Sequence, residues 1–402
     1  MEYQMKKLLF LLLIANFGCT NHKDSQENIK SGKQIPILAW YSIPPEQTTL
    51  LRYRELKETG ITYNLSFFPD AESMSRALDT AQKAGIKMIV SCPELKTKTE
   101  ETVRRFMTHP AVGGYMLRDE PNLTDFPELG EWAKRIRAVD DNHFCYLNLF
   151  PDYATEKQLG TKTYKEHVDL FIQEVPIQIL SFDHYPVIGD SLRANWYENL
   201  EIISEAARKA KKPFWAFALS VAHGPYPIPT VAQLRLQVFS DLAYGAQGIQ
   251  YFTYWTPYDT TWKFNNGPIT LEGKRTVVYD RIKLVNSEIR NLSGVFLGAS
   301  VISVSHTGGN IPAGTKSLGN LPDPIKVLKT EGTGALVSVL NNGANSYLVV
   351  VNRDFRNPMK LSIECDAKVK KVFKDGSVVP ANVYQNTTEI DPGDIAIYMW
   401  NE

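Results

Sequence analysis

The sequence predicts a (β/α)8 barrel of parallel strands, followed by a small C-terminal antiparallel β-sandwich domain. Between residue 36 and residue 299, short apolar runs rich in β-branched and aromatic residues alternate with longer amphipathic segments, as in repeated βα units. There are eight such runs, and eight parallel strands close a barrel. From residue 300 to residue 402, segments of alternating polarity are separated by turn residues, which is typical of antiparallel strands.

Each predicted barrel strand is a short apolar run bounded by polar or turn-forming residues. In chain order the strands are Ile37–Ser42, Tyr63–Phe68, Lys87–Cys92, Gly114–Arg118, Phe144–Leu149, Ile179–His184, Phe214–Leu219 and Ile249–Tyr254.

Segments with the period of an amphipathic helix lie between these strands, and one more follows the eighth strand. Gly85 and Gly245 each stand just past such a segment, where a left-handed residue commonly caps a helix. The predicted helices are Glu72–Ala84, Glu100–Met107, Glu128–Val139, Tyr197–Ala210, Val231–Tyr244 and Val278–Leu292.

The C-terminal segment alternates polar and apolar residues with period two and is interrupted by Asn-Asn-Gly, Lys-Asp-Gly and Pro-Gly-Asp turns. We expect this domain to be structural. Its predicted strands are Leu336–Leu340, Ser346–Val351, Lys360–Cys365, Val369–Phe373 and Ile395–Trp400.

Residues 1–19 have the pattern of a signal peptide. Two lysines precede an apolar run that is too short to span a bilayer, and Gly18 then precedes Cys19. A small residue before a cysteine resembles the processing site of bacterial lipoproteins, which implies a lipid on Cys19 and a membrane anchor at the bacterial cell envelope. Residues 20–35 are polar and without apolar period, so we interpret them as a tether.

The charge balance argues against a nucleic-acid partner. The chain has 44 basic and 44 acidic residues, and this gives no electrostatic reason to bind nucleic acid or an anionic membrane surface. A polar ligand is therefore expected to be uncharged. Apart from Cys19, the cysteines are Cys92, Cys145 and Cys365, whose spacing supports neither a metal site nor a disulfide framework. We expect no metal and no cofactor.

One motif stands out at the end of the fourth predicted strand. An apolar run that begins at Gly113 ends in Asp119 and Glu120, followed by the turn-forming Pro121. In a parallel barrel the carboxyl ends of the strands build the active site, so two adjacent carboxylates here indicate chemistry. The structural alternative is a pair of solvated acids near the positive end of a helix dipole. We favour the functional interpretation because other strand ends are also polar and aromatic.

Those other strand ends carry aromatic rings, amides and carboxylates. Aromatic rings stack on the C–H faces of sugars while amides, carboxylates and imidazoles bind hydroxyls, so the mixture predicts a neutral, hydroxyl-rich ligand. Large aromatic residues also plug barrel mouths, and a histidine at a strand end is equally often a structural hydrogen-bond donor. The predicted ligand-binding residues are Trp40, Tyr41, Asn148, His184, Tyr185, Tyr254 and Trp255, with His223 and Tyr226 as weaker candidates.

The chain resembles the (β/α)8 glycoside hydrolases of the large retaining clan that includes β-galactosidases and cellulases. In that clan an acid/base glutamate closes the fourth strand in an Asn-Glu-Pro-like motif, which matches residues 119–121 here with Asp119 in place of the asparagine. The resemblance implies that Glu120 is the general acid/base. The segment from Asp183 to Pro186 resembles one that lines the sugar site in related barrels, and residues 244–255 resemble the approach to the eighth strand in bacterial proteins of this type.

The seventh strand departs from that clan. The clan places a nucleophilic glutamate there, whereas residues 213–226 contain no carboxylate. A retaining mechanism needs a second carboxylate about 5–5.5 Å from the acid, and an inverting mechanism needs one about 6.5–9.5 Å away. We expect Asp183 to be this partner, with Asp119 as the second choice and Asp259 as the third; for each, a role in sugar binding is the alternative.

Two functions of different classes fit the sequence. The first is a glycosidase of the cell envelope that acts on neutral oligosaccharides or polysaccharides, with Glu120 as acid/base. The alternative is a surface lipoprotein that has kept the sugar site, has lost hydrolysis and binds glycans. A metal-dependent barrel hydrolase is disfavoured, because no His-x-His pair ends the first predicted strand.

Overall fold

A computed structural model describes residues 27–28, 33–384 and 387–401. The predicted signal peptide, with the proposed lipidation site Cys19, lies outside these residues, as does most of the predicted tether. Glu27 and Asn28, which fall within the predicted tether, form a short strand, β1 (Glu27–Asn28), that pairs with the C-terminal domain. Within the described residues, no helix is both long enough and apolar enough to cross a bilayer.

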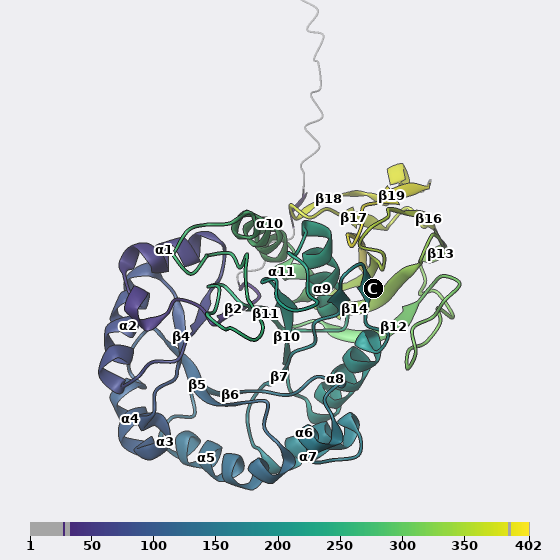
Figure 1. The fold of residues 1–402 in the computed structure, drawn as a ribbon. Helices are drawn as coiled ribbons and strands as arrows, with labels where there is room; N and C mark the ends of the chain where they lie inside the picture. Colours follow the sequence, from purple (N-terminus) through teal and green to yellow (C-terminus); the bar gives the residue numbers. More distant parts are fainter. Residues whose placement is uncertain (1–26, 29–32, 385–386, 402) are drawn as a thin grey trace, which may run out of the picture.

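Eight parallel strands in the described part of the chain form the barrel, in the order β6-β5-β4-β3-β2-β11-β10-β7. The sheet closes between β6 and β7, where the backbone N–H of Leu149 donates to the carbonyl of Ser181 at 2.8 Å. Figure 1 shows these strands as a ring inside a ring of helices. The predicted barrel is confirmed: each predicted strand overlaps one of β2 (Ile37–Trp40), β3 (Tyr63–Leu65), β4 (Lys87–Val90), β5 (Val112–Asp119), β6 (Phe144–Asn148), β7 (Leu180–Phe182), β10 (Phe214–Leu219) and β11 (Gly248–Phe252).

Every predicted helix is also present. Gly85 caps its helix with φ of 70°, as the sequence predicts, and Gly245 has φ of 99°. The helices are α2 (Ala71–Ala84), α3 (Glu94–Thr97), α4 (Thr99–Phe106), α5 (Phe126–Val139), α6 (Glu156–Leu159), α8 (Trp196–Ala210), α9 (Val231–Ala243), α10 (Val277–Asn291) and α11 (Ser293–Phe296), with 3-10 turns η1 (Pro45–Gln47) and η2 (Leu123–Asp125).

Besides the four-residue helices α3, α6 and α11, two longer helices escaped the sequence pattern, α1 (Leu50–Glu58) and α7 (Tyr164–Glu174). Helix α1 buries Tyr53 and Leu56 but leaves Leu51 73% exposed, so its apolar period is weak. Helix α7 begins after Thr163, whose side chain accepts a hydrogen bond from the N–H of Glu166 at 3.2 Å. Thr163, a favourable N-cap residue, was the sequence feature from which the start of α7 could have been predicted.

Side chains of the barrel strands alternate between an inner and an outer layer. Along β10, Trp215, Phe217 and Leu219 point into the barrel, whereas Ala216 and Ala218 belong to the layer shared with the helices. The inner layer gives the barrel a packed core and leaves room for a site only at one end.

Aromatic rings fill the barrel at the amino ends of the strands. Tyr63, Phe144 and Trp215 contact one another with ring centroids 5.4 to 6.1 Å apart. Glycines make room for them: a Cβ on Gly248 would lie 2.6 Å from the Trp215 indole, and one on Gly114 would lie 2.7 Å from the Phe144 carbonyl oxygen. The free end of the barrel is therefore the carboxyl end.

The C-terminal domain is a β-sandwich of two antiparallel sheets, as the sequence predicts. In the described residues its sheets have the orders β1-β18-β17-β20-β15-β14-β12 and β13-β16-β19, and a separate apolar core joins them. The strands are β12 (Ser300–His306), β13 (Ile325–Glu331), β14 (Ala335–Asn342), β15 (Asn345–Asn352), β16 (Met359–Cys365), β17 (Lys370–Val372), β18 (Ser377–Pro380), β19 (Thr388–Ile390) and β20 (Ile395–Asn401), with the 3-10 turn η3 (Ala381–Tyr384) before β19.

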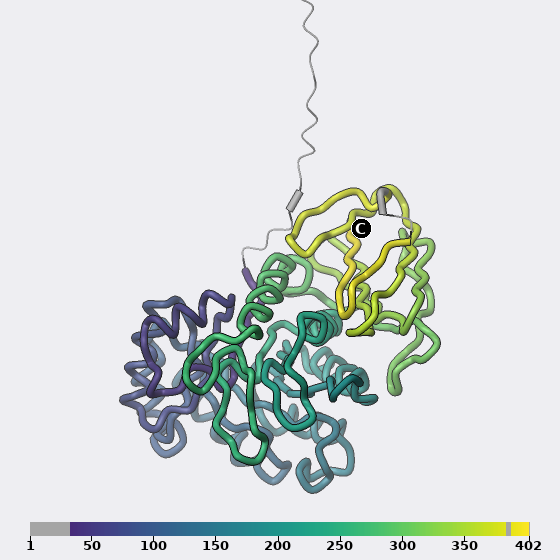
Figure 2. Tube along the Cα trace, turned by 45° about the horizontal axis from the view of Figure 1, so that its top comes forward, coloured from purple at the N-terminus to yellow at the C-terminus, as the bar shows by residue number. Residues whose placement is uncertain are grey.

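The larger sheet packs against the side of the barrel, next to α9 (Figures 1 and 2). Buried charges link the two domains. Arg235 on α9 forms ion pairs with Glu288 on α10 at 2.5 Å and with Asp394 of the sandwich at 3.4 Å, and Lys374 also contacts Asp394. The sandwich therefore covers the outside of the barrel and leaves its carboxyl end open.

Candidate active site

A cavity of about 440 Å³ opens at the carboxyl ends of the barrel strands. Its volume is in the range of small-ligand sites, and both carboxylates and aromatic rings face it. The lining residues are Trp40, Asp119, Glu120, Asn148, Tyr153, Asp183, Tyr185, Arg193, Phe217, His223, Pro225, Tyr226, Phe252, Trp262 and Phe264.

Asp119 and Glu120 both line the cavity although they are neighbours in the chain. A regular strand would point them to opposite sides. Here the register between β5 and β6 shifts between Met116 and Arg118, and Glu120 adopts a left-handed conformation with φ of 45°. The backbone N–H of Glu120 donates to the carbonyl of Asn148 at 2.8 Å, which holds this turn of the chain. The break in alternation brings both carboxylates to one site.

Asn148, at the end of β6, connects the carboxylates of β5 and β7. Its Nδ2 donates to Asp119 Oδ1 at 3.3 Å and to Asp183 Oδ1 at 3.2 Å, while its Oδ1 accepts from Ser181 Oγ at 2.8 Å. Oδ1 of Asp119 and Oδ1 of Asp183 therefore lie close together, because both are within hydrogen-bond distance of the same nitrogen.

A buried polar network supports Asn148 from inside the barrel. Ser181 Oγ lies 3.1 Å from the Tyr146 hydroxyl and accepts from Gln250 Nε2 at 2.8 Å, and the Tyr146 hydroxyl donates to Gln250 Oε1. Tyr146, Ser181 and Gln250 are fully buried. Such a satisfied network fixes the amide of Asn148 in one orientation.

Burial raises the pKa of every carboxyl group in this cluster. The pKa of Asp119 rises to about 6 because the surrounding protein desolvates it, although the hydrogen bond from Asn148 acts in the opposite direction. The pKa of Glu120 rises to about 7, chiefly through desolvation and then through the charge of Asp119. The pKa of Asp183 lies well above its usual value because of burial and the charges of Glu120 and Asp119. Glu120 therefore remains partly protonated near neutral pH, whereas Asp119 is mostly ionised there.

Aromatic side chains form the remaining wall of the cavity. Trp40 contacts Phe217 with ring centroids 5.9 Å apart, and Tyr185 stacks on Phe252 at 5.6 Å. Trp262 is 52% exposed at the rim. Ring faces of this kind suit the apolar faces of a sugar.

The segment after β10 supplies no carboxylate to the cavity, since residues 213–226 contain none. His223 and Tyr226 line it instead, and the His223 ring lies 4.5 Å from that of Phe264. Burial lowers the pKa of His223, so its imidazole is neutral at neutral pH.

Sequence reasoning missed several lining residues that the structure brings to the cavity. Phe217 and Phe252 were within predicted strands, and their inward position follows from the alternation of side chains. Tyr153, Arg193 and Phe264 lie on irregular loops, for which periodicity gives no signal.

The prediction that His184 lines the cavity is wrong. Asp183 and Tyr185 face the cavity, so the side chain between them points the other way. His184 is buried behind the wall, with Nε2 3.4 Å from Asp152 Oδ1 and its ring 5.0 Å from that of Tyr153. The geometry therefore favours a structural role for His184.

Tyr254 and Trp255 are also outside the cavity, and the prediction for them is wrong. They are 1% and 2% exposed and pack in the outer core. After Phe252 the chain turns outward, and the backbone N–H of Trp255 donates to the backbone carbonyl of Tyr41 at 3.1 Å. The guanidinium of Arg52 lies 5.2 Å from the centroid of the Trp255 ring. Tyr41 is half-buried against the apolar cores and is not among the lining residues of the cavity.

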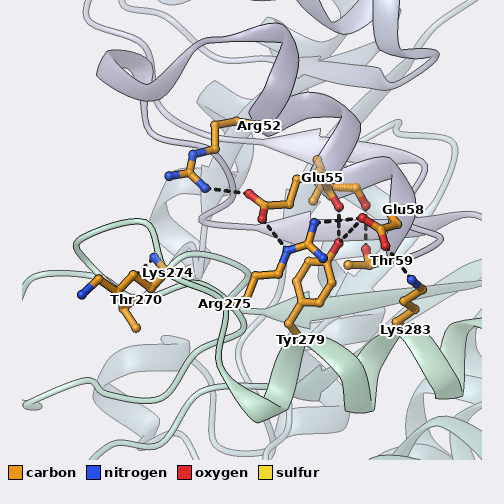
Figure 3. A network of polar contacts seen from close by, with 10 residues as sticks. Arg52, Glu55, Glu58, Thr59, Thr270, Lys274, Arg275, Tyr279 and Lys283 are labelled. Atoms are coloured by element: carbon orange, nitrogen blue, oxygen red, sulfur yellow. Dashed lines mark hydrogen bonds and ion pairs between the residues drawn. The ribbon is translucent and has the colours of Figure 1, made fainter.

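A network of ion pairs fixes the segment after β11 against α1 (Figure 3). Arg275, just before α10, bonds Glu55 Oε1 at 2.6 Å and Glu58 Oε2 at 2.9 Å. This segment carries Trp262 and Phe264 to the cavity. The network therefore positions one rim of the site from outside it.

Asp259, the third candidate for the second carboxylate, is exposed on the same segment and does not line the cavity. Its Oδ1 accepts the backbone N–H groups of Thr261 and Trp262, both at 2.7 Å. This is a turn-stabilising role.

The carboxylate cluster lacks the arrangement of a metal centre. In the described residues, no three or more His, Cys, Asp or Glu side chains are placed to hold a metal ion. The described cysteines Cys92, Cys145 and Cys365 are buried free thiols.

Comparison with solved structures finds a similar architecture in several glycosidases. A GH42 β-galactosidase from G. stearothermophilus is similar with a TM-score of 0.64, over 94% of this chain and 100% of that chain, at 9% sequence identity. A β-galactosidase from Bacillus circulans sp. alkalophilus is similar with a TM-score of 0.61, over 91% and 99% of the two chains, at 9% identity.

The chain has a glycosidase-like TIM-barrel fold. An α-amylase from Geobacillus thermoleovorans is also similar, with a TM-score of 0.57 over 92% of this chain and 99% of that chain at 10% identity. No protein-family model matches the sequence, and no curated protein is significantly similar to it. The likeness therefore concerns the fold, and the chemistry has to be argued from the cavity.

Proposed function

We propose that this protein is a glycosidase in which Glu120 is the general acid/base and Asp183 is the second carboxylate. The observation that carries the proposal is the gathering of Asp119, Glu120 and Asp183 around Asn148, in a cavity otherwise walled largely by aromatic rings. Paired carboxyl groups beside sugar-stacking surfaces are what hydrolysis of a glycosidic bond requires. The glycosidase-like fold is consistent with this chemistry.

Glu120 suits the acid role because its pKa is raised to about 7. A carboxyl group that is still protonated near neutral pH can donate its proton to the leaving oxygen of the glycosidic bond. The left-handed turn that presents Glu120 to the cavity places this proton at the carboxyl end of β5.

Asp183 suits the partner role because it is fixed. It is 8% exposed, and the amide of Asn148 and the hydroxyl of Tyr185 hydrogen-bond it. Burial and the charges of Glu120 and Asp119 raise the pKa of Asp183, while the hydrogen bonds from Asn148 and Tyr185 lower it. The oxocarbenium-like positive charge of the transition state also lowers it and so favours the ionised carboxylate during reaction. Asp119 is the alternative partner, since it shares the amide of Asn148.

The second candidate function is glycan binding without hydrolysis. Residues 213–226 contain no carboxylate, so the nucleophile that the resembling clan carries on this strand is missing. A barrel without that nucleophile could still bind a glycan, and this observation therefore favours the binding function. Both functions use the same cavity and differ in turnover.

The test is hydrolysis of a panel of aryl α- and β-glycosides and oligosaccharides by wild type, Glu120→Gln and Asp183→Asn. Glu101→Gln on α4 and Asp280→Asn on α10 are matched controls with exposed side chains. Hydrolysis that either site variant abolishes, and that both controls retain, supports the glycosidase. Sugar-dependent thermal stabilisation of wild type without hydrolysis of any substrate would support the binding protein.

We further propose that Cys19 carries a lipid that anchors the protein at the bacterial cell envelope. The basis is the sequence of residues 5–19, with lysines, an apolar run and a small residue before the cysteine. Expression of the full chain in a bacterial host with labelled palmitate tests it. Label in wild type and its loss in Cys19→Ser are expected; equal labelling of both contradicts the proposal.

A further inference from the structure

Arg193 brings a positive charge into the cavity. It follows the hairpin of β8 (Val187–Ile188) and β9 (Ser191–Leu192), in the connection between β7 and α8. Its guanidinium lies 4.0 Å from the centroid of the Tyr153 ring, Nη2 donates to the Tyr226 hydroxyl at 2.9 Å, and Nε donates to the Tyr185 carbonyl at 3.3 Å. Stacking and these two hydrogen bonds fix the plane of the guanidinium.

Each of these contacts is to a neutral group. Within the described part of the chain, Arg193 forms no ion pair with a carboxylate, in contrast to Arg235, which pairs with both Glu288 and Asp394. A guanidinium has five N–H bonds, and two of those of Arg193 are used. The N–H bonds of Nη1 form no hydrogen bond within the described residues, and Arg193 lines the cavity.

We propose that the cavity binds a sugar carrying an anionic group, a carboxylate or a sulfate ester, and that Arg193 recognises this group. The proposal rests on the glycosidase function proposed above and defines its substrate class. A fixed guanidinium binds such oxygens by parallel charge-assisted hydrogen bonds. Tyr226 accepts from Arg193, and a tyrosine hydroxyl that accepts can also donate its own O–H to the same anion.

The proposal revises the expectation of an uncharged ligand. That expectation was based on the balance of charges over the whole chain, which averages over distant surfaces. Recognition depends on the local field, and the local cation is Arg193. The raised pKa values of Asp119 and Glu120 also reduce the negative charge that an anionic sugar meets near neutral pH.

The experiment compares neutral and anionic sugars of the same ring configuration. Calorimetry measures binding of glucose, glucuronate and glucose 6-sulfate, and of galactose, galacturonate and galactose 6-sulfate, at low and at high salt. Where turnover is found, kcat/KM is measured on the 4-nitrophenyl hexoside and hexuronide. The proteins are wild type, Arg193→Gln, Arg193→Lys and the control Arg54→Gln, which changes an exposed arginine on α1.

We expect wild type to prefer one anionic sugar over its neutral counterpart by about 10- to 100-fold, as hydrogen bonds to charged groups suggest. High salt should reduce this ratio. Arg193→Gln should reduce the ratio of anionic to neutral affinity to about one. Arg193→Lys should retain part of this ratio, because the charge remains while the bidentate guanidinium is lost. Arg54→Gln should leave the ratio unchanged. The preferred anion distinguishes a uronate from a sulfate ester.

Two results would overturn the inference: equal affinity of wild type for neutral and anionic sugars, or an anionic preference that persists in Arg193→Gln. Preferential anionic binding through Arg193 without hydrolysis would retain the inference and refute the glycosidase. Hydrolysis of neutral glycosides without anionic preference would retain the glycosidase and refute the inference. If Arg193→Gln fails to fold, the wild-type ratio and Arg193→Lys still decide.

Discussion

The side-chain amide of Asn148 donates a hydrogen bond to Oδ1 of Asp183 at 3.2 Å. The same nitrogen contacts Asp119, so one amide at the end of β6 organises carboxylates from the strands on both sides. Hydrogen bonds of this kind favour the ionised form of each carboxyl group and oppose the desolvation that raises its pKa. Asn148 therefore influences both the position and the acidity of Asp119 and Asp183, the two candidates for the second carboxylate.

Replacing Asn148 by Ala should raise the pKa of Asp119 and Asp183 further. The acidic limb of the kcat/KM–pH profile then shifts to higher pH, and kcat/KM falls by about 10- to 100-fold, as expected for a lost hydrogen bond to a charged group. The control is Asn142→Ala, which removes an exposed amide. A fall in kcat/KM that is the same at every pH would indicate that Asn148 acts only through packing.

The carboxylate cluster should make the protein less stable as pH rises. The folded-state pKa values of Asp119, about 6, and Glu120, about 7, lie above the ordinary values of 3.8 and 4.5. At a pH below the ordinary pKa values, the raised pKa values contribute fully to the stability of the folded protein. This contribution is lost as the pH rises through the folded-state pKa values. Urea unfolding between pH 4 and pH 8 should show a smaller loss in Glu120→Gln than in wild type. An identical pH dependence in the two proteins would contradict the raised pKa of Glu120.

Gly114 is predicted to tolerate no side chain. A Cβ at this position would lie 2.7 Å from the backbone carbonyl oxygen of Phe144, which cannot move without breaking the pairing of β5 with β6. Gly114→Ala should lower the free energy of unfolding by about 1–3 kcal/mol, the usual cost of overpacking. Gly309→Ala, where a Cβ meets nothing within 4 Å, should change it little. Equal stability of the two variants, measured by urea unfolding, would contradict the close approach of β5 and β6 at Gly114.

The ion pairs of Arg275 should affect both stability and ligand affinity. Arg275→Ala removes contacts with Glu55 and Glu58, and we expect about 1 kcal/mol of lost stability because the arginine is 46% exposed. The freed segment carries Trp262 and Phe264, so KM should rise more than kcat falls. Lys326→Ala, which removes an exposed pair with Asp323, should leave KM unchanged. A variant of Arg275 with normal KM would show that the network does not position this rim.

Much of the fold could be predicted because barrel strands and helices differ in apolar period. The weakly amphipathic α1 was missed for the same reason, since period is its only strong signal. In the site, strand ends gave Asp119, Glu120, Asn148 and Asp183, and all four line the cavity. Their roles remain proposals.

The errors in the site have a common physical origin. Proximity to a strand end does not fix the direction of a side chain: His184 points away from its neighbour Asp183, and the chain leaves the barrel before Trp255. Arg193 lies on a loop whose course depends on packing against Tyr153 and Tyr226, which no local pattern encodes.

The most direct test of the central claim is the dependence of kcat/KM on the leaving group in Glu120→Gln and Asp183→Ala, with and without azide. If Glu120 is the acid, its variant should lose about 10²–10⁴-fold on poor leaving groups and far less on dinitrophenyl glycosides, which need no protonation. If Asp183 is the partner, its variant should be impaired with every leaving group and should be rescued by azide with formation of a glycosyl azide. Loss of activity that is independent of the leaving group in Glu120→Gln, with normal activity in Asp183→Ala, would contradict the account.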